Sequence, residues 1–327
     1  MDIVQKIAEE LNVKPQQVNS AIALLDEGAT VPFISRYRKE ATGGLDDLQL
    51  RDLELRLYYL REMQDRKQAI LTSIKDQDKL TPLLEKQVLA ALTKAELEDI
   101  YLPYKPKRRT KAMIALEAGL EPLADQLYAD PTLNPESVAE LFISKDKGVT
   151  DCKSALDGAK QILMERWSEN AELSGQLRSY LWDYGYLESR VFEDKKSEAE
   201  KFRDYFEYDE QLKKIPPHRA LAVFRGRKEG FLAVSLISHL KTDDSAVKVL
   251  DPCEAMICKR FGIEDKKRAA DKWLQETVRW TWKIKLLTRL ESDLLGQLRE
   301  TADEESIRVF AENMKAILLA PPAGNKI

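Results

Sequence analysis

Apolar side chains recur at seven-residue steps between residues 266 and 300, and this repeat limits the fold more than any other feature of the sequence. The repeat positions hold Trp273, Trp280, Leu287 and Leu294, with Thr277, Ile284 and Leu298 between them. Such spacing is typical of an α-helix that packs along one stripe of its surface. A helix of about 35 residues spans roughly 50 Å, so we expect a long spine helix in an elongated molecule.

The remainder of the chain also favours helices. Glycine and proline number 13 each among 327 residues, which is roughly 4% each against typical values of about 7% and 5%. A second apolar repeat runs from Leu50 to Ile74 and is broken at Gln64 and Lys67. This repeat predicts another long helix that needs a packing partner. We therefore predict a mainly α, multi-helical fold.

One region departs from the helical pattern. Between residues 187 and 239, the segments "YLESRVF" and "GFLAVSLIS" alternate or cluster like strands, and proline and glycine punctuate them. They predict a small β-hairpin or sheet. We place a soft domain boundary near residue 190. The expected parts are an N-terminal helical domain (1–190), a central region with the β element and the long helix (191–320), and a linker (321–327).

The first 26 residues predict two short helices joined by a tight turn at residues 12–14, with Pro15 opening the second helix. This is the outline of a helix-turn-helix, which can place its second helix in the major groove of DNA. Beyond Lys14 the second helix carries no basic residue, so phosphate attraction would be weak. DNA reading and a plain packing corner both remain open.

Residues 31–47, "VPFISRYRKEATGGLDD", could form either a phosphate cradle or a corner between helices. A helical wheel predicts an apolar face of Phe33, Ile34, Tyr37 and Ala41. Arg36 and Lys39 lie opposite, and Arg38 flanks them. The cradle is disfavoured, because acidic residues at the start of the next helix would repel an anion. Any nucleic-acid contact made by this stretch would use these three cations.

The Gly43–Gly44 pair is expected to end this helix, as glycine does by adopting positive φ without a Cβ clash. Asp46 and Gln49 then have the spacing of a capping box at the start of the following helix.

The strongest local charge lies in "YLPYKPKRRTK", residues 101–111. Five cations occur there without an acid: Lys105, Lys107, Arg108, Arg109 and Lys111. They could neutralise phosphates while the neighbouring Tyr101 and Tyr104 offer stacking faces. A solvated basic loop without a ligand is the alternative.

A second basic patch covers residues 266–289, where eight Lys or Arg accompany Trp273, Trp280 and Trp282. The heptad spacing of Trp273 and Trp280 favours core anchors over base-stacking platforms.

Residues for catalysis or for binding a metal or cofactor are not recognisable in the sequence. The two histidines and three cysteines lack zinc-site spacing, and no GxSxG, Walker or GxGxxG motif occurs. We expect no enzymatic activity, metal or cofactor. Basic and acidic residues number 52 and 56, so any nucleic-acid contact must use local patches. Unpaired cysteines, no signal peptide and no long apolar run predict a cytoplasmic protein without a membrane partner.

Several blocks of the sequence resemble the Tex family of bacterial transcription accessory proteins. They include "VPFISRYRKEATGGLDD", "EDIYLPYKPKRRTKA", "ALDGAKQILMERW", "AEKFRDYFEYDE", "HRALAVFRGRKEG", "VRWTWKIKLL" and "EESIRVFAENMKAILLAPPAG". The resemblance implies the N-terminal portion of a longer protein, before an RNase H-like (YqgF) domain, helix-hairpin-helix units and an S1 domain. It also implies a role in transcription and binding of nucleic acid, mainly RNA or other single strands. The alternative is a helical scaffold that meets protein partners such as RNA polymerase or ribosome-associated factors.

Overall fold

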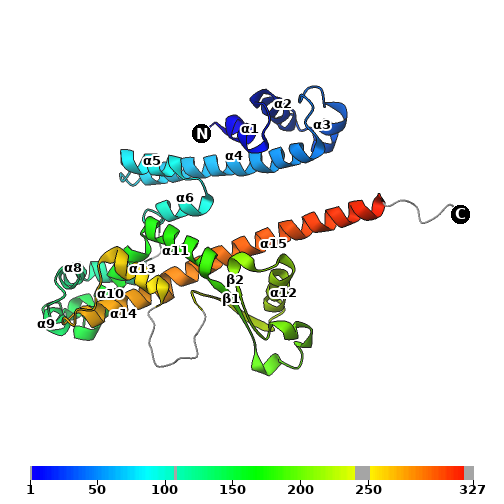
Figure 1. Cartoon of the computed structure of the whole chain (residues 1–327). Helices are drawn as coiled ribbons and strands as arrows, with labels where there is room; N and C mark the ends of the chain where they lie inside the picture. The colour runs from blue at the N-terminus through cyan, green and yellow to red at the C-terminus, as the bar shows by residue number, and fades with distance from the viewer. Residues whose placement is uncertain (1, 107–108, 240–250, 320–327) are drawn as a thin grey trace. The chain divides into compact units, whose positions relative to one another are not determined.

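The computed structural model describes residues 2–106, 109–239 and 251–319, and these are mostly helical (Figure 1). They divide into two compact units, Met1–Lys105 and Pro106–Ile327. The predicted mainly α class is confirmed. Residue 190 lies inside strand β1 (Tyr186–Val191) of the second unit, and the expected linker at 321–327 lies outside the described residues. Within the described ranges, no helix is long and apolar enough to cross a membrane.

Three short helices pack against one half of a long helix in the first unit, and two pack against its other half (Figure 1). The six helices are α1 (Ile3–Leu11), α2 (Pro15–Asp26), α3 (Val31–Tyr37), α4 (Asp47–Lys75), α5 (Pro82–Ala90) and α6 (Lys94–Tyr101). Buried leucines of α4 form the base of the core beneath α1–α3. Helix α4 is the long helix predicted from the second apolar repeat.

Local sequence signals set several helix ends of the first unit as predicted. Asn12 adopts a left-handed conformation in the turn between α1 and α2, and Pro15 is the first residue of α2. The Asp46 carboxylate accepts a hydrogen bond from the Gln49 amide at 2.8 Å, and the Gln49 side chain accepts one from the Asp46 amide. The helix-turn-helix-like start and the capping box are therefore confirmed.

Lys67 explains why the α4 repeat is broken. Its Nζ donates to the carbonyl oxygens of Leu89 and Ala91, both at 2.7 Å, and so caps the C-terminal end of α5. The side chain is almost fully buried, and desolvation lowers the pKa of the ammonium group. A positive charge here is stabilised by the negative end of the α5 helix dipole.

We expect Lys67→Met to weaken the packing of α5 on α4, because two carbonyl oxygens lose their donor while the aliphatic stem is kept. The opening free energy of α5 should fall by about 1–3 kcal/mol, measured as faster hydrogen exchange of the α5 amides. The exposed Lys86 of the same helix provides the control: Lys86→Met should leave exchange unchanged. Equal effects of the two variants would contradict the capping role.

The second unit is built around α10 (Cys152–Ser168), which packs against several other helices. The remaining helices are α7 (Lys111–Glu117), α8 (Glu121–Ala129), α9 (Pro135–Glu140), α11 (Ala171–Tyr184), α12 (Pro217–Lys228), α13 (Pro252–Phe261), α14 (Asp271–Trp280) and α15 (Leu287–Leu318). One continuous apolar core joins these helices to a small sheet.

The β element is a three-stranded antiparallel sheet rather than a simple hairpin. Its order is β2-β1-β3, with β2 at Glu207–Gln211 and β3 at Leu232–Ile237. Leu187 pairs with Leu236 in register, and β3 packs against α12 and α15. The two apolar strands were predicted. Strand β2 was not, because "EYDEQ" is an acidic edge strand without apolar alternation.

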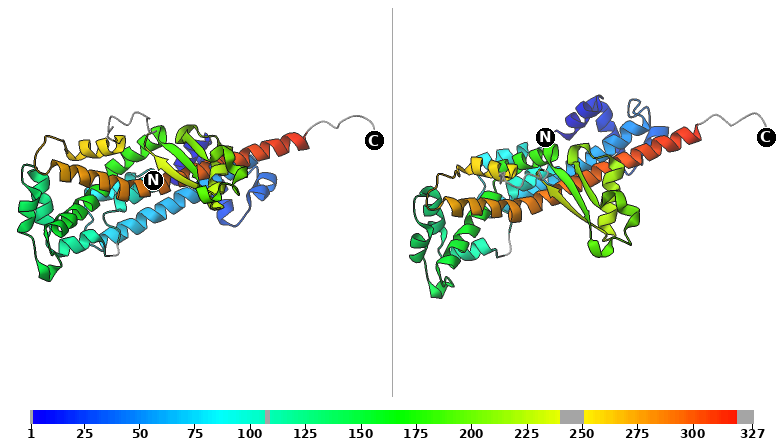
Figure 2. Two further views of the ribbon diagram at one scale, coloured as in Figure 1. Left: turned by 90° about the horizontal axis from the view of Figure 1, so that it is seen from below. Right: turned by 60° about the horizontal axis from the view of Figure 1, so that its bottom comes forward.

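The long helix predicted from the first repeat is present, and it continues farther than expected. Helix α14 passes through a π-helical segment, Thr281–Leu286, directly into α15 (Figure 2). The apolar segment at residues 305–318 is the end of this same helix.

The buried stripe of this helix does not follow the predicted heptad. Buried side chains recur every four residues: Leu274, Val278, Trp282, Leu286, Leu290, Leu294, Leu298 and Ala302. In an α-helix, a four-residue step turns the stripe by about 40°. The π-helical segment has more residues in each turn and offsets part of this rotation. Trp280 falls beside the stripe and is 43% exposed, so its assignment as a core anchor was wrong, whereas Trp273 is buried.

Candidate nucleic-acid interface

Helix α3 and the turn after it hold the first group of predicted phosphate contacts. Val31 and Ile34 are buried and anchor the helix to the core of the first unit. In the turn, the buried Thr42 donates through Oγ1 to the Lys39 carbonyl at 3.1 Å, and the Gly44 amide donates to the same carbonyl at 2.9 Å. The backbone that carries the cations is therefore fixed from the inside.

Arg36, Arg38 and Lys39 are all exposed, and none forms an ion pair with the residues that the structure describes. Arginines on the neighbouring α4 differ in this respect. Arg56 pairs with Glu10 and Arg61 with Asp26, which fastens α1 and α2 to α4. Arg36 in the last turn of α3 and the two cations that follow the helix are thus available to an anionic ligand.

Two aromatic rings lie beside these cations. Phe33 and Tyr37 are 44% and 72% exposed, and their ring centroids are 5.4 Å apart. The helical wheel placed both on a packing face with Ile34 and Ala41, and this was wrong for all but Ile34. Helix α3 ends at Tyr37, so the wheel does not apply to the residues that follow. We call Arg36, Arg38, Lys39, Phe33 and Tyr37 the α3 surface.

The glycine pair does not end α3, which stops six residues earlier, but it shapes the turn into α4. Gly43 and Gly44 have φ values of +62° and +92°, a region that favours glycine. Gln17 of α2 also donates to the Gly43 carbonyl at 2.8 Å, and a Cβ at Gly43 would lie 3.0 Å from its Cγ. The pair therefore forms a corner between helices and packs against α2. This is the alternative that the sequence favoured over a phosphate cradle.

The acids near the α3 surface have other roles, with one exception. Asp46 caps α4, and Asp47 pairs with Arg51 at 2.8 Å. Glu40 is exposed and has no ion-pair partner among the described residues. Residues 36–40 therefore carry a formal charge of +2, from three cations and one acid.

The basic run from Lys105 to Lys111 is only partly available for binding. Lys105 and Lys111 are exposed and have no ion-pair partner in the part of the chain that the structure describes. Arg109 pairs with Glu117 of α7. Lys107 and Arg108 lie outside the described residues.

Tyr101 does not offer the stacking face expected beside this run, and Tyr104 is partly covered. Tyr101 is buried, shares a hydrogen bond of 2.9 Å with Ser73 and lies under the Arg66 guanidinium, while Tyr104 packs on the same core. Both rings belong to the contact between α4 and α6. The stacking interpretation was wrong for Tyr101, whereas Tyr104 is half-buried and its role in stacking stays a prediction.

Two of the cysteines are poorly placed for nucleophilic chemistry. Burial and the neighbouring Asp251 raise the pKa of the Cys253 thiol, and burial also raises that of Cys258. Such thiols are poor nucleophiles because little thiolate forms at neutral pH. Among the described residues, no group of three His, Cys, Asp or Glu is placed to hold a metal ion.

Sequence reasoning found the cations of the α3 surface but missed its aromatic rings. A seven-residue helix makes fewer than two full turns, so apolar periodicity cannot distinguish its buried side from its exposed side. Proximity of aromatic and basic residues in "FISRYRK" was the available signal.

Comparisons with known proteins cover nearly the whole chain and point to one family. Residues 130–310 match a family model described as Tex central region-like, and residues 1–75 match one described as Tex-like protein N-terminal domain. The chain is 54% identical to Protein YhgF of Escherichia coli, over 97% of this chain and 41% of that protein. It is 50% identical to the transcriptional accessory protein Tex of Neisseria gonorrhoeae, over 99% of this chain and 42% of that protein.

A more distant relative is the human S1 RNA-binding domain-containing protein 1, which is 26% identical over 98% of this chain and 32% of that protein. The chain spans about two fifths of the length of the two bacterial relatives.

Proposed function

The chain belongs to the Tex family, and on that premise we propose that it is the N-terminal part of a cytoplasmic transcription accessory protein that binds nucleic acid, mainly RNA, in its full-length form. This part adds contacts of its own to a single strand. The observation that carries the proposal is the α3 surface, where three cations without ion-pair partners among the described residues adjoin two exposed aromatic rings. Cations neutralise phosphates, and aromatic rings stack on bases without regard to sequence. The chain would act by binding rather than by catalysis.

The names of the relatives support this proposal at a coarser level. One bacterial relative is a transcriptional accessory protein, and the human relative is named for an S1 RNA-binding domain. A longer protein with an S1 domain would hold RNA there, and the α3 surface would add phosphate contacts. Lys105 and Lys111 are further candidates for such contacts.

Fluorescence anisotropy with a labelled RNA strand of about 12 nucleotides tests the proposal. Three neutralised phosphates give a slope of about −2 in a plot of log Kobs against log salt, since each single-strand phosphate contributes about 0.7. Binding that weakens in this way between roughly 50 and 200 mM salt is the expected result. An RNA titration without any binding at the low salt concentration would show that the proposal is wrong.

A scaffold that binds protein partners is the second candidate, and the end of α15 favours it. A stripe of apolar side chains there is exposed: Ile307, Phe310, Met314, Ile317 and Leu318. Contiguous exposed apolar surface is typical of protein contacts. Under this reading the chain binds RNA polymerase or a ribosome-associated factor and has no affinity for RNA. Pull-down with purified polymerase, compared with the RNA titration, distinguishes the two functions.

A further inference from the structure

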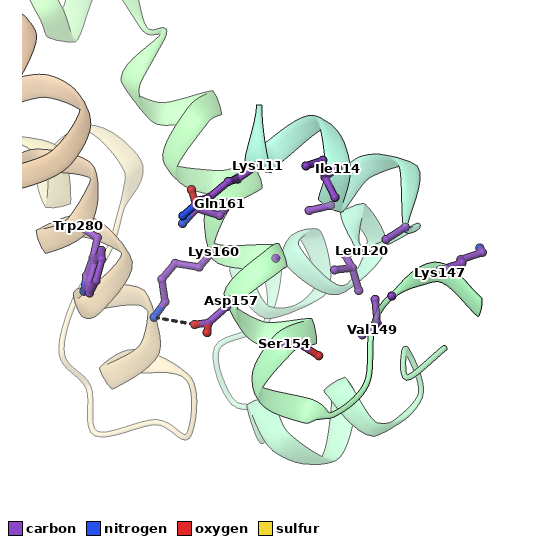
Figure 3. A pocket seen from close by; sticks show the side chains of 14 residues that line it. Lys111, Ile114, Leu120, Lys147, Val149, Ser154, Asp157, Lys160, Gln161 and Trp280 are labelled. Carbon is purple, nitrogen blue, oxygen red and sulfur yellow. Dashed lines mark ion pairs between the residues drawn. The ribbon is translucent and has the colours of Figure 1, made fainter. Parts of the chain in front are cut away.

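A hollow of about 390 Å³ lies in the second unit, on the surface of α10 between α7 and α14 (Figure 3). Its floor is made by small and apolar side chains, among them Ala115, Ala118 and Leu120. Gly158 of α10 contributes no side chain, and a Cβ there would lie 2.4 Å from Leu120 Cδ1. The volume falls within the range of pockets that hold small ligands, roughly 300–1,000 Å³.

Trp280 forms one wall of this hollow and is the exposed tryptophan of the long helix. Lys160 extends from α10 toward the indole, and its Nζ lies 5.9 Å from the ring centroid (Figure 3). The Lys160 ammonium is also held by Glu276 at 3.2 Å and by Asp157 at 3.7 Å. Because two carboxylates offset its charge, Lys160 supports the indole without making the hollow cationic.

Positive charge at the rim comes instead from Lys111 and Lys147. Both are exposed, and neither forms an ion pair within the described ranges. Asp157 and Gln161 supply hydrogen-bonding groups inside the rim. These features match the parts of a nucleotide. The apolar floor and the exposed indole suit its planar ring, the polar groups suit the edge of that ring, and the two available ammonium groups suit its phosphates.

We propose that this hollow takes up one base of a single-stranded nucleic acid, stacked on Trp280, with the adjoining phosphates at Lys111 and Lys147. The inference rests on the proposed function and adds a second nucleic-acid site to the α3 surface. An acidic peptide would satisfy the two lysines but would leave the indole without a planar partner.

Trp280→Ala tests the proposal in the full chain. Two probes are used: an RNA strand of about 12 nucleotides, and a sugar-phosphate strand of the same length without bases. We expect the variant to bind RNA about tenfold more weakly, since loss of one stacked base reduces affinity by roughly that factor or more. The strand without bases should bind the wild type and the variant equally, because it has nothing to stack on Trp280.

Two further variants serve as controls. Trp280→Phe keeps a stacking ring and should recover most of the RNA affinity. Tyr184→Ala removes a 60% exposed aromatic ring of α11 that does not line the hollow, and it should bind RNA as the wild type does.

The remaining outcomes separate this inference from the proposed function. Wild-type RNA binding that is unchanged in Trp280→Ala overturns the base-binding hollow and leaves the α3 surface untouched. No RNA binding by the wild type at low salt overturns both. A polyglutamate peptide that binds the wild type and loses the same affinity on Trp280→Ala would assign the hollow to acidic peptides and overturn the inference.

Discussion

Replacement of Arg36, Arg38 and Lys39 together by glutamine is expected to lower RNA affinity by one to two orders of magnitude near roughly 100 mM salt. Each cation is exposed and lacks an ion-pair partner among the described residues, so each can neutralise one phosphate and release its counterions. The salt slope should become shallower by about 2, because three single-strand phosphates contribute about 0.7 each. Fluorescence anisotropy across a salt series measures both quantities.

A matched control changes the same amount of charge elsewhere in the first unit. Lys75, Lys79 and Lys86 are exposed, have no ion-pair partner within the described part of the chain, and lie away from the α3 surface. Their triple replacement by glutamine should alter affinity and salt slope little. If both triple variants lose affinity equally, RNA responds to total charge and the α3 surface is not the site.

The sequence was most informative where neighbouring residues decide the structure. The turn at Asn12, the start of α2 at Pro15 and the capping box of Asp46 with Gln49 each depend on backbone and side-chain groups within a few positions. Interactions of this range are encoded directly in the spacing of residue types, so these elements could be predicted before any packing was known.

Side-chain exposure was harder to predict, because distant contacts decide it. Tyr101 and Tyr104 adjoin a basic run, yet both pack on the core shared by α4 and α6. Phe33 and Tyr37 were placed on a packing face, yet both are exposed. The sequence of these short segments does not determine which of their side chains another helix will bury.

The long helix shows the same limit on a larger scale. A heptad assumes one straight partner, but α14 packs against α10 and α13, whereas α15 packs against α11, α12 and β3. Its buried stripe therefore moves around the helix and advances by four residues at each step. This explains why Trp282, outside the heptad, is 1% exposed while Trp280, inside it, is not buried.

Trp282→Ala should be among the most destabilising substitutions in the second unit, with a loss of about 3–5 kcal/mol. The change leaves a large cavity in the core. It also removes the indole Nε1 donor, which lies 3.1 Å from Asp251 Oδ2, at the residue that caps α13. Native-state hydrogen exchange of the α10 and α14 amides measures the loss, because it reports on this unit separately from the first.

Two companion variants distinguish the packing of Trp282 from a general effect of losing tryptophan. Trp282→Phe keeps most of the buried ring but loses the hydrogen bond to Asp251, so an intermediate loss of about 1–2 kcal/mol is expected. Trp280→Ala should cost less than about 1 kcal/mol, since the side chain is 43% exposed and its removal opens no closed cavity. A larger loss of stability for Trp280→Ala than for Trp282→Ala would contradict the four-residue stripe. It would support the heptad as the pattern of buried positions.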